Sequence, residues 1–243
     1  MKLCIIPARS GSKRIVDKNI KLFQGKPIIG YSIETAQASD CFDKIIVSTD
    51  DEKIAAISRD YGAETPFIRP KDLADDFTGT MPVISHAIRW YIEQNIPISI
   101  VCCLYATAPF VTTDNLLGAY QKLLSTDADY CFSVTKYHFP IQRAIKVTLD
   151  DRITMFDQSY LNTRSQDLEE AYHDAGQFYW GKAKAFLAEK SLFSEYATPY
   201  IIPSYQVQDI DTLEDWIRAE HIFSVMKATE SCWQSSGQTP LTK

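Results

Sequence analysis

The sequence predicts an α/β fold in which a mostly parallel sheet is covered by helices on both sides. Short apolar runs alternate with amphipathic stretches over residues 1–135, and this alternation is typical of parallel strands joined by helices. Residues 98–104 are predominantly apolar, as expected for a central strand that is buried on both faces. At 243 residues, the chain has the length of one medium α/β domain with its own core.

The strands are expected where a short apolar run ends at polar or turn-forming residues. These runs cover residues 3–6, 44–49, 65–68, 98–104 and 130–134. The helices between them are indicated by apolar residues at helical spacing, namely Ile29, Ile33 and Ala36, then Ile54, Ile57 and Tyr61, then Ile84, Ala87, Ile88 and Tyr91, then Leu116, Leu117, Tyr120 and Leu124. Ligands of such sheets bind beyond the carboxyl ends of the strands, so functional residues are expected directly after these runs.

Two of the helices carry local start and stop signals. Pro27 suits the first turn of the first helix, and Gly62 can end the second. The second helix follows Thr49-Asp50-Asp51-Glu52, which has the spacing of a capping box. Asp50 and Asp51 are therefore expected to act first as helix caps.

The pattern changes after Thr135, where the helical period is lost. Residues 136–174 are expected to leave the sheet as a small β-rich excursion with a hairpin around Asp150, and this excursion is interpreted as a dimerisation arm that also serves the sugar pocket. Two further runs, residues 177–180 and 200–202, are expected to return as strands to the sheet.

The end of the chain is expected to divide into a helix and a tail. Thr212 opens a terminal helix that carries Leu213, Trp216 and Ile217. Residues 1–228 are thus expected to form a single domain, and the polar residues 229–243 a disordered tail.

The composition is ordinary for a soluble globular protein, with 23% charged residues and a net charge of −6. This acidic balance disfavours a nucleic-acid surface, although a basic pocket can lie within an acidic protein. The six cysteines lack metal-ligand spacing, and several lie in apolar runs, so reduced thiols in a cytoplasmic protein are expected. The N-terminal apolar run is too short for a signal peptide, and no stretch approaches a membrane span, so no membrane partner is expected.

The residues after the first strand are suited to bind an anion such as a triphosphate. The small residues Ser10, Gly11 and Ser12 allow backbone N–H groups to approach an anion closely. Four cations lie within ten positions, at Arg9, Lys13, Arg14 and Lys18. Neither a Walker A loop nor G-x-G-x-x-G is present. A solvated basic loop is the plainer interpretation, but the end of the first strand of a parallel sheet favours an anion site.

Asp209-Ile210-Asp211 is the second chemical motif. Two carboxylates at alternate positions of an extended segment point to the same side, and together they can hold Mg²⁺. A helix cap is an equal alternative from the residues alone, because Asp211 or Thr212 can cap the helix that follows.

A resemblance to a known family begins at the anion loop. Residues 5–14 with Lys18 and Asn19 resemble the opening motif of the CMP-sialic acid synthetases, which are acylneuraminate cytidylyltransferases. The match continues in order and spacing to about Glu220, through Gly25-Lys26-Pro27, Val47-Ser48-Thr49-Asp50-Asp51, Arg69-Pro70 and Leu73-Ala74-Asp75-Asp76. Ser10 stands where the family usually has glycine. The resemblance implies a three-layer, Rossmann-like nucleotidyltransferase fold of the nucleotide-diphospho-sugar transferase type, and a homodimer.

Three stretches, residues 105–110, 139–143 and 164–180, resemble the branch of this family that uses pseudaminic acid. The resemblance implies an enzyme that transfers CMP from CTP to the anomeric hydroxyl of an acidic nine-carbon 2-keto sugar, with Mg²⁺ as cofactor and pyrophosphate as the second product. It also associates the chain with flagellin glycosylation. The open alternatives are a CMP synthetase for sialic or legionaminic acid and, from another class, a nucleotide-binding regulator without catalysis.

The resemblance also implies roles for individual residues. The phosphates of CTP would be bound by Arg9, Ser10, Gly11, Ser12, Lys13 and Lys18, and the nucleoside by Asn19, Arg69 and Thr80. The sugar would lie against Tyr105, Arg164, Gln166, His173, Gln177 and Tyr179. Mg²⁺ would be held by Asp209 and Asp211. Lys18, Arg9 and Asp211 are the expected catalytic groups, and the Asp75–Asp76 pair could orient basic groups. A metal-bound water and Asp211 are both candidates for the general base.

Overall fold

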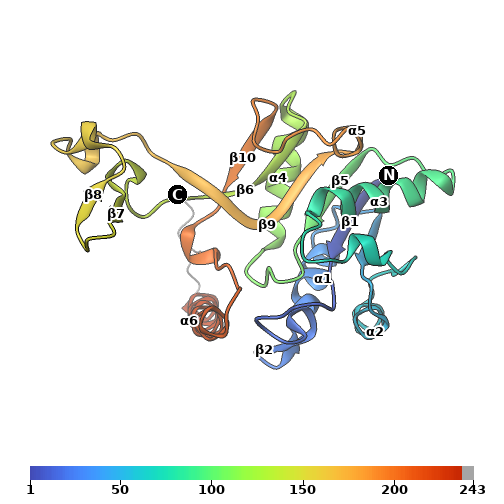
Figure 1. The fold of residues 1–243 in the computed structure, drawn as a ribbon. Helices are drawn as coiled ribbons and strands as arrows, with labels where there is room; N and C mark the ends of the chain where they lie inside the picture. Colours follow the sequence, from blue (N-terminus) through green and yellow to red (C-terminus); the bar gives the residue numbers. More distant parts are fainter. Residues whose placement is uncertain (237–243) are drawn as a thin grey trace.

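The chain folds around a six-stranded sheet, which a computed structural model describes for residues 1–236 (Figure 1). The strand order is β10-β6-β9-β5-β1-β4. The strand bounds are Lys2–Pro7 for β1, Lys44–Ser48 for β4, Ile100–Leu104 for β5, Tyr130–Lys136 for β6, Tyr172–Lys182 for β9 and Ala197–Ile201 for β10. Strand β9 runs antiparallel to β5 and β6, and the other neighbours are parallel. The predicted mostly parallel α/β fold is confirmed.

The helices cover both faces of this sheet and give the three expected layers. They are α1 (Ile28–Ala38), α2 (Glu52–Asp60), α3 (Thr80–Glu93), α4 (Thr113–Ser125), α5 (Ala183–Leu187) and α6 (Leu213–Ser236). Side chains alternate between the faces of β1, so Cys4 packs in a core with α1 and α4, while Ile5 packs in a second core with α3 and α5. The apolar runs of the sequence are therefore buried on both sides, as a central sheet requires.

Two local expectations need correction. Helix α2 is capped by Asp51, whose carboxylate accepts hydrogen bonds from the backbone N–H groups of Lys53 and Ile54, rather than by Thr49. The expected strand at residues 65–68 is wrong, because this segment adds only isolated bridges, one of which pairs Thr49 with Ile68. Pro66 interrupts that segment and has no N–H group to donate to a strand ladder.

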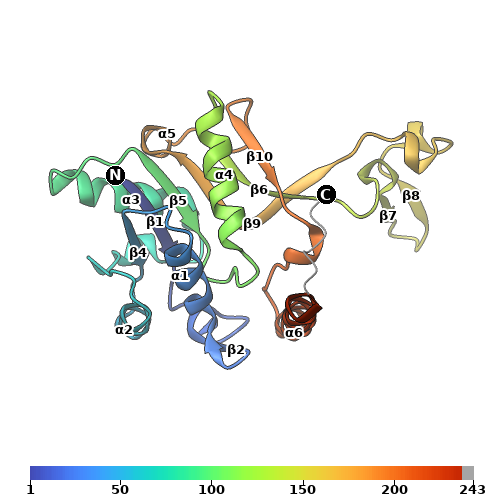
Figure 2. The same ribbon diagram turned by 180° about the vertical axis from the view of Figure 1, so that it is seen from behind.

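Residues 137–171 form an arm that projects from the end of the sheet (Figure 1). Its core is the expected hairpin, in which β7 (Ile145–Val147) pairs antiparallel with β8 (Ile153–Met155). The arm also holds three short 3-10 helices. The view from behind shows the same separation between the arm and the helices of the sheet (Figure 2). Strand β9 is long because it runs from this arm back into the centre of the sheet.

A small third core attaches α6 to the rest of the molecule. Phe23 lies on β2 (Leu22–Phe23), in a short hairpin with β3 (Lys26–Pro27), and its ring centroid is 5.6 Å from Trp216 and 5.3 Å from Phe223. Phe110 and Phe223 also pack edge to face, at 5.7 Å. Aromatic side chains from the first and the last parts of the chain thus fix the start of α6, and with it the segment that precedes the helix.

The expected boundary at residue 229 is wrong, because α6 continues to Ser236. The remaining residues of the expected tail, 237–243, lie outside the described part of the chain. Within residues 1–236, no helix combines the length and apolar character that a membrane span needs. Cys4, Cys102, Cys103 and Cys131 are free and buried, as expected from their apolar runs.

Candidate active site

A cavity of about 320 Å³ lies at the carboxyl ends of β1 and β5, where ligands of such sheets are expected. Pro7 and Ala8 contribute the end of β1, and Tyr105 and Ala106 follow β5. The residues predicted for the nucleotide that line this cavity are Arg9, Ser12, Lys13, Lys18, Asn19, Arg69 and Thr80. The cavity is also lined by Tyr105 and by Asp211, which come from the predicted sugar and metal sets. Residues far apart in the sequence therefore meet at one edge of the sheet.

The anion loop follows β1, and hydrogen bonds to its backbone groups hold it in place. The Ala8 N–H group donates to Ser48 on β4, at 3.0 Å, so the start of the loop stays attached to the sheet. The Asn19 side chain is buried and donates through Nδ2 to the carbonyl oxygen of Arg9, also at 3.0 Å. Asn19 thereby closes the loop, which brings the cationic side chains of Arg9 and Lys18 to the same cavity.

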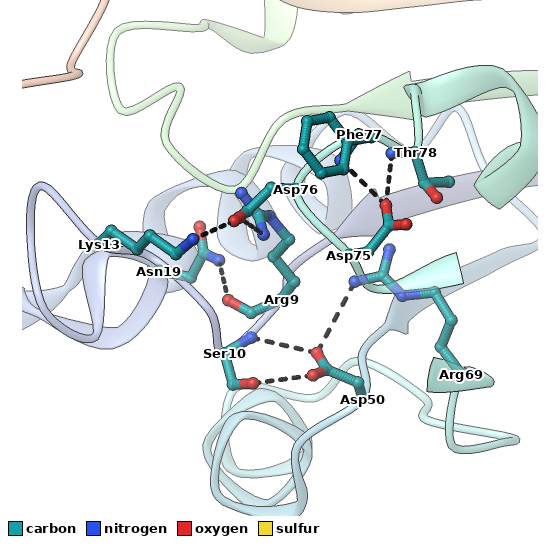
Figure 3. Close-up of polar contacts among 10 residues, drawn as sticks. All are labelled: Arg9, Ser10, Lys13, Asn19, Asp50, Arg69, Asp75, Asp76, Phe77 and Thr78. Atoms are coloured by element: carbon teal, nitrogen blue, oxygen red, sulfur yellow. Dashed lines mark hydrogen bonds and ion pairs between the residues drawn. The ribbon is translucent and has the colours of Figure 1, made fainter. Parts of the chain in front are cut away.

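Ser10 and Gly11 are not among the residues that line the cavity. Ser10 turns toward the end of β4, where its N–H and hydroxyl groups both donate to the Asp50 carboxylate, at 3.1 and 2.8 Å (Figure 3). Direct contact of Ser10 and Gly11 with phosphate stays a prediction. Asp50 was expected to cap a helix, so its contact with the loop is a role that the sequence did not indicate. The position of Asp50 directly after a parallel strand was the sequence signal that could have indicated this role.

Asp76 neutralises part of the anion loop. Its carboxylate pairs with Arg9 Nη1 at 2.6 Å and also with the Lys13 ammonium group (Figure 3). These hydrogen bonds hold the pKa of Asp76 below its ordinary value. The neighbouring Asp75 shapes the turn instead, because its Oδ1 accepts the N–H groups of Phe77 and Thr78. The idea that this acidic pair orients basic groups therefore applies to Asp76.

For CTP, the ligand that the sequence predicts, replacing Asp76 with asparagine is expected to lower the KM by about threefold, because the carboxylate would compete with phosphate oxygens for the same two cations. Pyrophosphate should also become a stronger product inhibitor. Steady-state rates at varied CTP and pyrophosphate measure both effects. Asp72→Asn, which removes an exposed carboxylate from the same segment, is the control. An increase in the KM for CTP in Asp76→Asn would instead indicate that Asp76 positions the cations.

The carboxylate of Asp211 faces the anion loop from the far end of the chain. Lys18 Nζ lies 3.3 Å from Asp211 Oδ1 and donates to the carbonyl oxygen of Ile210 at 2.8 Å, while Arg14 Nη2 lies 2.9 Å from Asp211 Oδ2. The start of α6 is capped by Thr212, whose hydroxyl accepts the N–H of Asp215. The side chain of Asp211 is therefore available to the cavity and is not used as the helix cap.

The chemistry of Asp209 and Asp211 fits a divalent cation. Partial burial raises the pKa of Asp209, and the nearby negative charge of Asp211 raises it further. A cation between the two carboxylates would relieve this repulsion. Within residues 1–236, no group of three or more His, Cys, Asp or Glu side chains is placed to hold a metal ion. Two carboxylates completed by water and phosphate oxygens are, however, a donor set that Mg²⁺ uses.

Two tyrosines connect the cavity to β9. The hydroxyl groups of Thr80 and Tyr105 lie 3.0 Å apart, and the Tyr105 ring packs against Tyr179 with centroids 5.4 Å apart. The Tyr179 hydroxyl donates to Asp174 Oδ2 at 2.7 Å. Burial is the main cause that raises the pKa of both tyrosines, so both stay protonated at neutral pH. They therefore serve as hydrogen-bonding groups rather than as bases.

The other residues predicted for the sugar lie outside this cavity. Gln177 is buried and donates to the carbonyl oxygen of Gln206 at 2.5 Å, and the His173 ring packs against Tyr137 at the base of the arm. Arg164 lies in the arm, 71% exposed, and makes a two-pronged ion pair with Asp167. Gln166 lines a separate hollow of about 360 Å³ in the arm. Their contact with a sugar stays a prediction.

Comparison with known proteins places this geometry in a family. A sequence profile described as cytidylyltransferase matches residues 3–236. The pseudaminic acid cytidylyltransferase of Campylobacter jejuni serotype O:2 is 45% identical over 223 residues, which cover 92% of this chain and 96% of the relative. The N-acylneuraminate cytidylyltransferase of Escherichia coli O18:K1:H7 is 33% identical, over 88% of this chain and 50% of the relative.

Solved structures share the fold at low sequence identity. A CMP:2-keto-3-deoxy-manno-octonic acid synthetase in complex with CTP matches 93% of this chain and 99% of its own, with a TM-score of 0.67 at 14% identity. The 4-diphosphocytidyl-2C-methyl-D-erythritol synthase of Anaerococcus prevotii matches 92% of this chain and 98% of its own, with a TM-score of 0.61 at 16% identity. These likenesses confirm the nucleotidyltransferase type of fold. Together with the profile match over nearly the whole sequence, they show that the chain belongs to the cytidylyltransferase family and is a nucleotidyltransferase.

Proposed function

We propose that the chain transfers CMP from CTP to the anomeric hydroxyl of pseudaminic acid, with release of pyrophosphate. The observation that carries this proposal is the convergence of Arg9, Lys13, Lys18 and Asp211 on one cavity at the carboxyl edge of the sheet. The substrate follows from the relative that is 45% identical and bears the name of this activity. The sequence stretch at residues 164–180, which resembles the same branch, supports the same choice of sugar.

The cationic side chains are suited to bind the triphosphate and to stabilise charge on it. Transfer of this kind depends on positioning and charge stabilisation, because the protein forms no bond to the phosphorus. Lys18 is partly buried and held by the Ile210 carbonyl group, so its ammonium group has a fixed place for the α-phosphate. Arg9 and Lys13 come earlier in the same loop and line the same cavity, and they are assigned to the β- and γ-phosphates. Asn19 and Arg69 are assigned to the cytosine edge, and Thr80 to the nucleoside.

Asp209 and Asp211 are the residues that would hold Mg²⁺ in this proposal. When bound, Mg²⁺ supplies a Lewis acid that neutralises charge on the triphosphate. Lys18 and Arg14 both pair with Asp211, so this carboxylate organises the cations around the place proposed for the reacting phosphate. The proton of the sugar hydroxyl would be accepted by Asp211 or by a water molecule near it.

The sugar pocket is proposed to require a second copy of the chain. Tyr105 lines the cavity, but Arg164 lies in the projecting arm, away from the helices and sheet that form it (Figure 2). The arm also exposes large apolar side chains, including Phe139, Val147, Leu149, Ile153, Phe156 and Leu161. Exposed apolar groups of this extent mark an interaction surface. A symmetric homodimer would cover them and bring Arg164 to the partner's cavity. The buried free cysteines support a reducing, cytoplasmic location.

The proposal is tested by pyrophosphate release from CTP and Mg²⁺ with a panel of acidic sugars. Pseudaminic acid is expected to give the highest kcat/KM, and sialic and legionaminic acids much lower values. A preference for either of those sugars would leave the proposed reaction in place and change only its sugar substrate, since the CMP-N,N'-diacetyllegionaminic acid synthase of Legionella pneumophila is also a relative, at 29% identity. Binding of CTP without pyrophosphate release for any sugar would support the non-catalytic regulator instead.

A further inference from the structure

Asp50 lies between the anion loop and Arg69, the residue assigned to the cytosine edge. It follows the carboxyl end of β4, and its two carboxylate oxygens accept the N–H and hydroxyl groups of Ser10. The same Oδ1 atom lies 3.8 Å from Nη2 of Arg69 (Figure 3). One carboxylate therefore contacts both the anion loop, through Ser10, and Arg69, which lines the cavity.

The guanidinium group of Arg69 is a buried cation. Its side chain is only 3% exposed, and that of Asp50 is 16% exposed. Burial lowers the pKa of Arg69, and the Asp50 charge opposes this shift. Within residues 1–236, Nε and Nη2 of Arg69 have no hydrogen-bond acceptor. A buried cation is stable only near an opposite charge, and its unpaired N–H groups are available to an acceptor on a ligand.

The backbone around this pair is also fixed. The Arg69 N–H group donates to the carbonyl oxygen of Thr49, the residue before Asp50, at 2.7 Å. Thr49 and Ile68 form an isolated parallel bridge, so the segment with Arg69 is attached to the end of β4. These main-chain contacts hold the backbone of Arg69 next to Asp50, and the Asp50 carboxylate lies 3.8 Å from the Arg69 guanidinium group.

We propose that Asp50 is a positioning residue, which orients the buried Arg69 guanidinium for the pyrimidine edge and, through Ser10, fixes it relative to the anion loop. This inference rests on the proposed function and deepens it, because it assigns the geometry of nucleotide recognition. The hydroxyl of Ser10, where the family usually has glycine, adds a second contact to this carboxylate that glycine lacks. Recognition of the base and of the phosphates is thus coupled through one side chain.

Binding of CTP and UTP to Asp50→Ala, measured by calorimetry, tests the proposal. We expect the Kd for CTP to rise by about tenfold and the preference for CTP over UTP to fall to the value of Arg69→Ala. The double variant Asp50→Ala/Arg69→Ala should show no further loss of preference, because Asp50 acts through Arg69. Ser10→Ala should raise the Kd for CTP by about threefold, since it removes one of the two contacts that Ser10 makes with the Asp50 carboxylate.

Glu52→Gln is the matched control, because Glu52 is an exposed carboxylate two residues away that pairs with Arg59. If Asp50→Ala does not fold, Asp50→Asn retains the shape of the side chain and removes its charge. The preference for CTP over UTP is then measured on that variant. Equal weakening of CTP and UTP in the variant that folds would overturn the proposal and leave Asp50 a purely structural residue. A wild-type chain that does not prefer CTP would contradict the proposed function instead, so the two failures are distinguishable.

Discussion

Replacing Asp211 with alanine is expected to abolish pyrophosphate release, with a fall in kcat of about a thousandfold or more. Asp211 is the carboxylate that Lys18 and Arg14 share, and it is one of the two proposed ligands of Mg²⁺. Its removal takes the shared carboxylate away from both cations and leaves the proposed Mg²⁺ site with one carboxylate. Initial rates with CTP, Mg²⁺ and pseudaminic acid measure the effect, and calorimetry of Mg²⁺ with CTP measures the loss of cation binding.

The stability of this variant should be close to that of the wild type, because α6 is capped by Thr212 and Asp215 rather than by Asp211. Thermal unfolding therefore separates a chemical role from a structural one. Glu214→Ala removes a nearby exposed carboxylate that pairs with Arg218, and it should retain full activity. Full activity in Asp211→Ala would contradict the metal assignment.

Arg164→Lys is expected to raise the KM for the sugar by about ten- to a hundredfold, with little change in CTP binding. Arg164 is proposed to hold the sugar carboxylate with its planar, two-pronged guanidinium group, and lysine provides only a point charge. Its present partner, Asp167, shows that the side chain already makes this type of contact with a carboxylate. Rates at varied sugar and direct CTP titrations give the two affinities. Loss of CTP binding would instead indicate that Arg164 belongs to the CTP pocket, and it would contradict the assignment to the sugar pocket.

The same residue tests the homodimer. When Arg164→Ala and Asp211→Ala chains are mixed and allowed to exchange, activity should return to about a quarter of the wild-type value, because half of the dimers are mixed and each has one intact site. If the chains exchange and activity does not return, Arg164 contributes to the cavity of its own chain or to no cavity. Sedimentation of the wild type gives the oligomeric state directly, and a monomer would contradict the assembly.

The sequence predicted most strands of the sheet and the position of the basic loop at its carboxyl edge, because both depend on local patterns. Apolar runs and helical spacing identify strands and helices, and the loop follows the first strand by connectivity alone. The antiparallel direction of β9 was not accessible, since its ladders with β5 and β6 join residues far apart in the sequence. Asp50 was misjudged for a related reason: its local spacing resembles a cap, while its contacts come from Ser10 and Arg69.

The predicted sugar residues show where proximity in the sequence misleads. Arg164 and Tyr179 belong to one recognisable stretch, but the extended strand β9 separates them. Each residue of a strand advances the chain by about 3.3 Å, so residues close in number can lie at opposite ends of an arm. The structure places Arg164 in the projecting arm and Tyr179 on the part of β9 that lies between β5 and β6.

The aromatic core of Phe23, Phe110, Trp216 and Phe223 has a consequence for synthesis of the protein on the ribosome. The anion loop is made first, and the aromatic residues of α6 that fix the segment with Asp211 are added about two hundred residues later. A chain that is cut between Asp211 and Phe223 retains its basic loop and Asp211, but it lacks the Phe223 ring that packs on Phe23 and Phe110. Because domains fold as units once their sequence has emerged, we expect a chain that ends before Phe223 to bind CTP more weakly than the full chain.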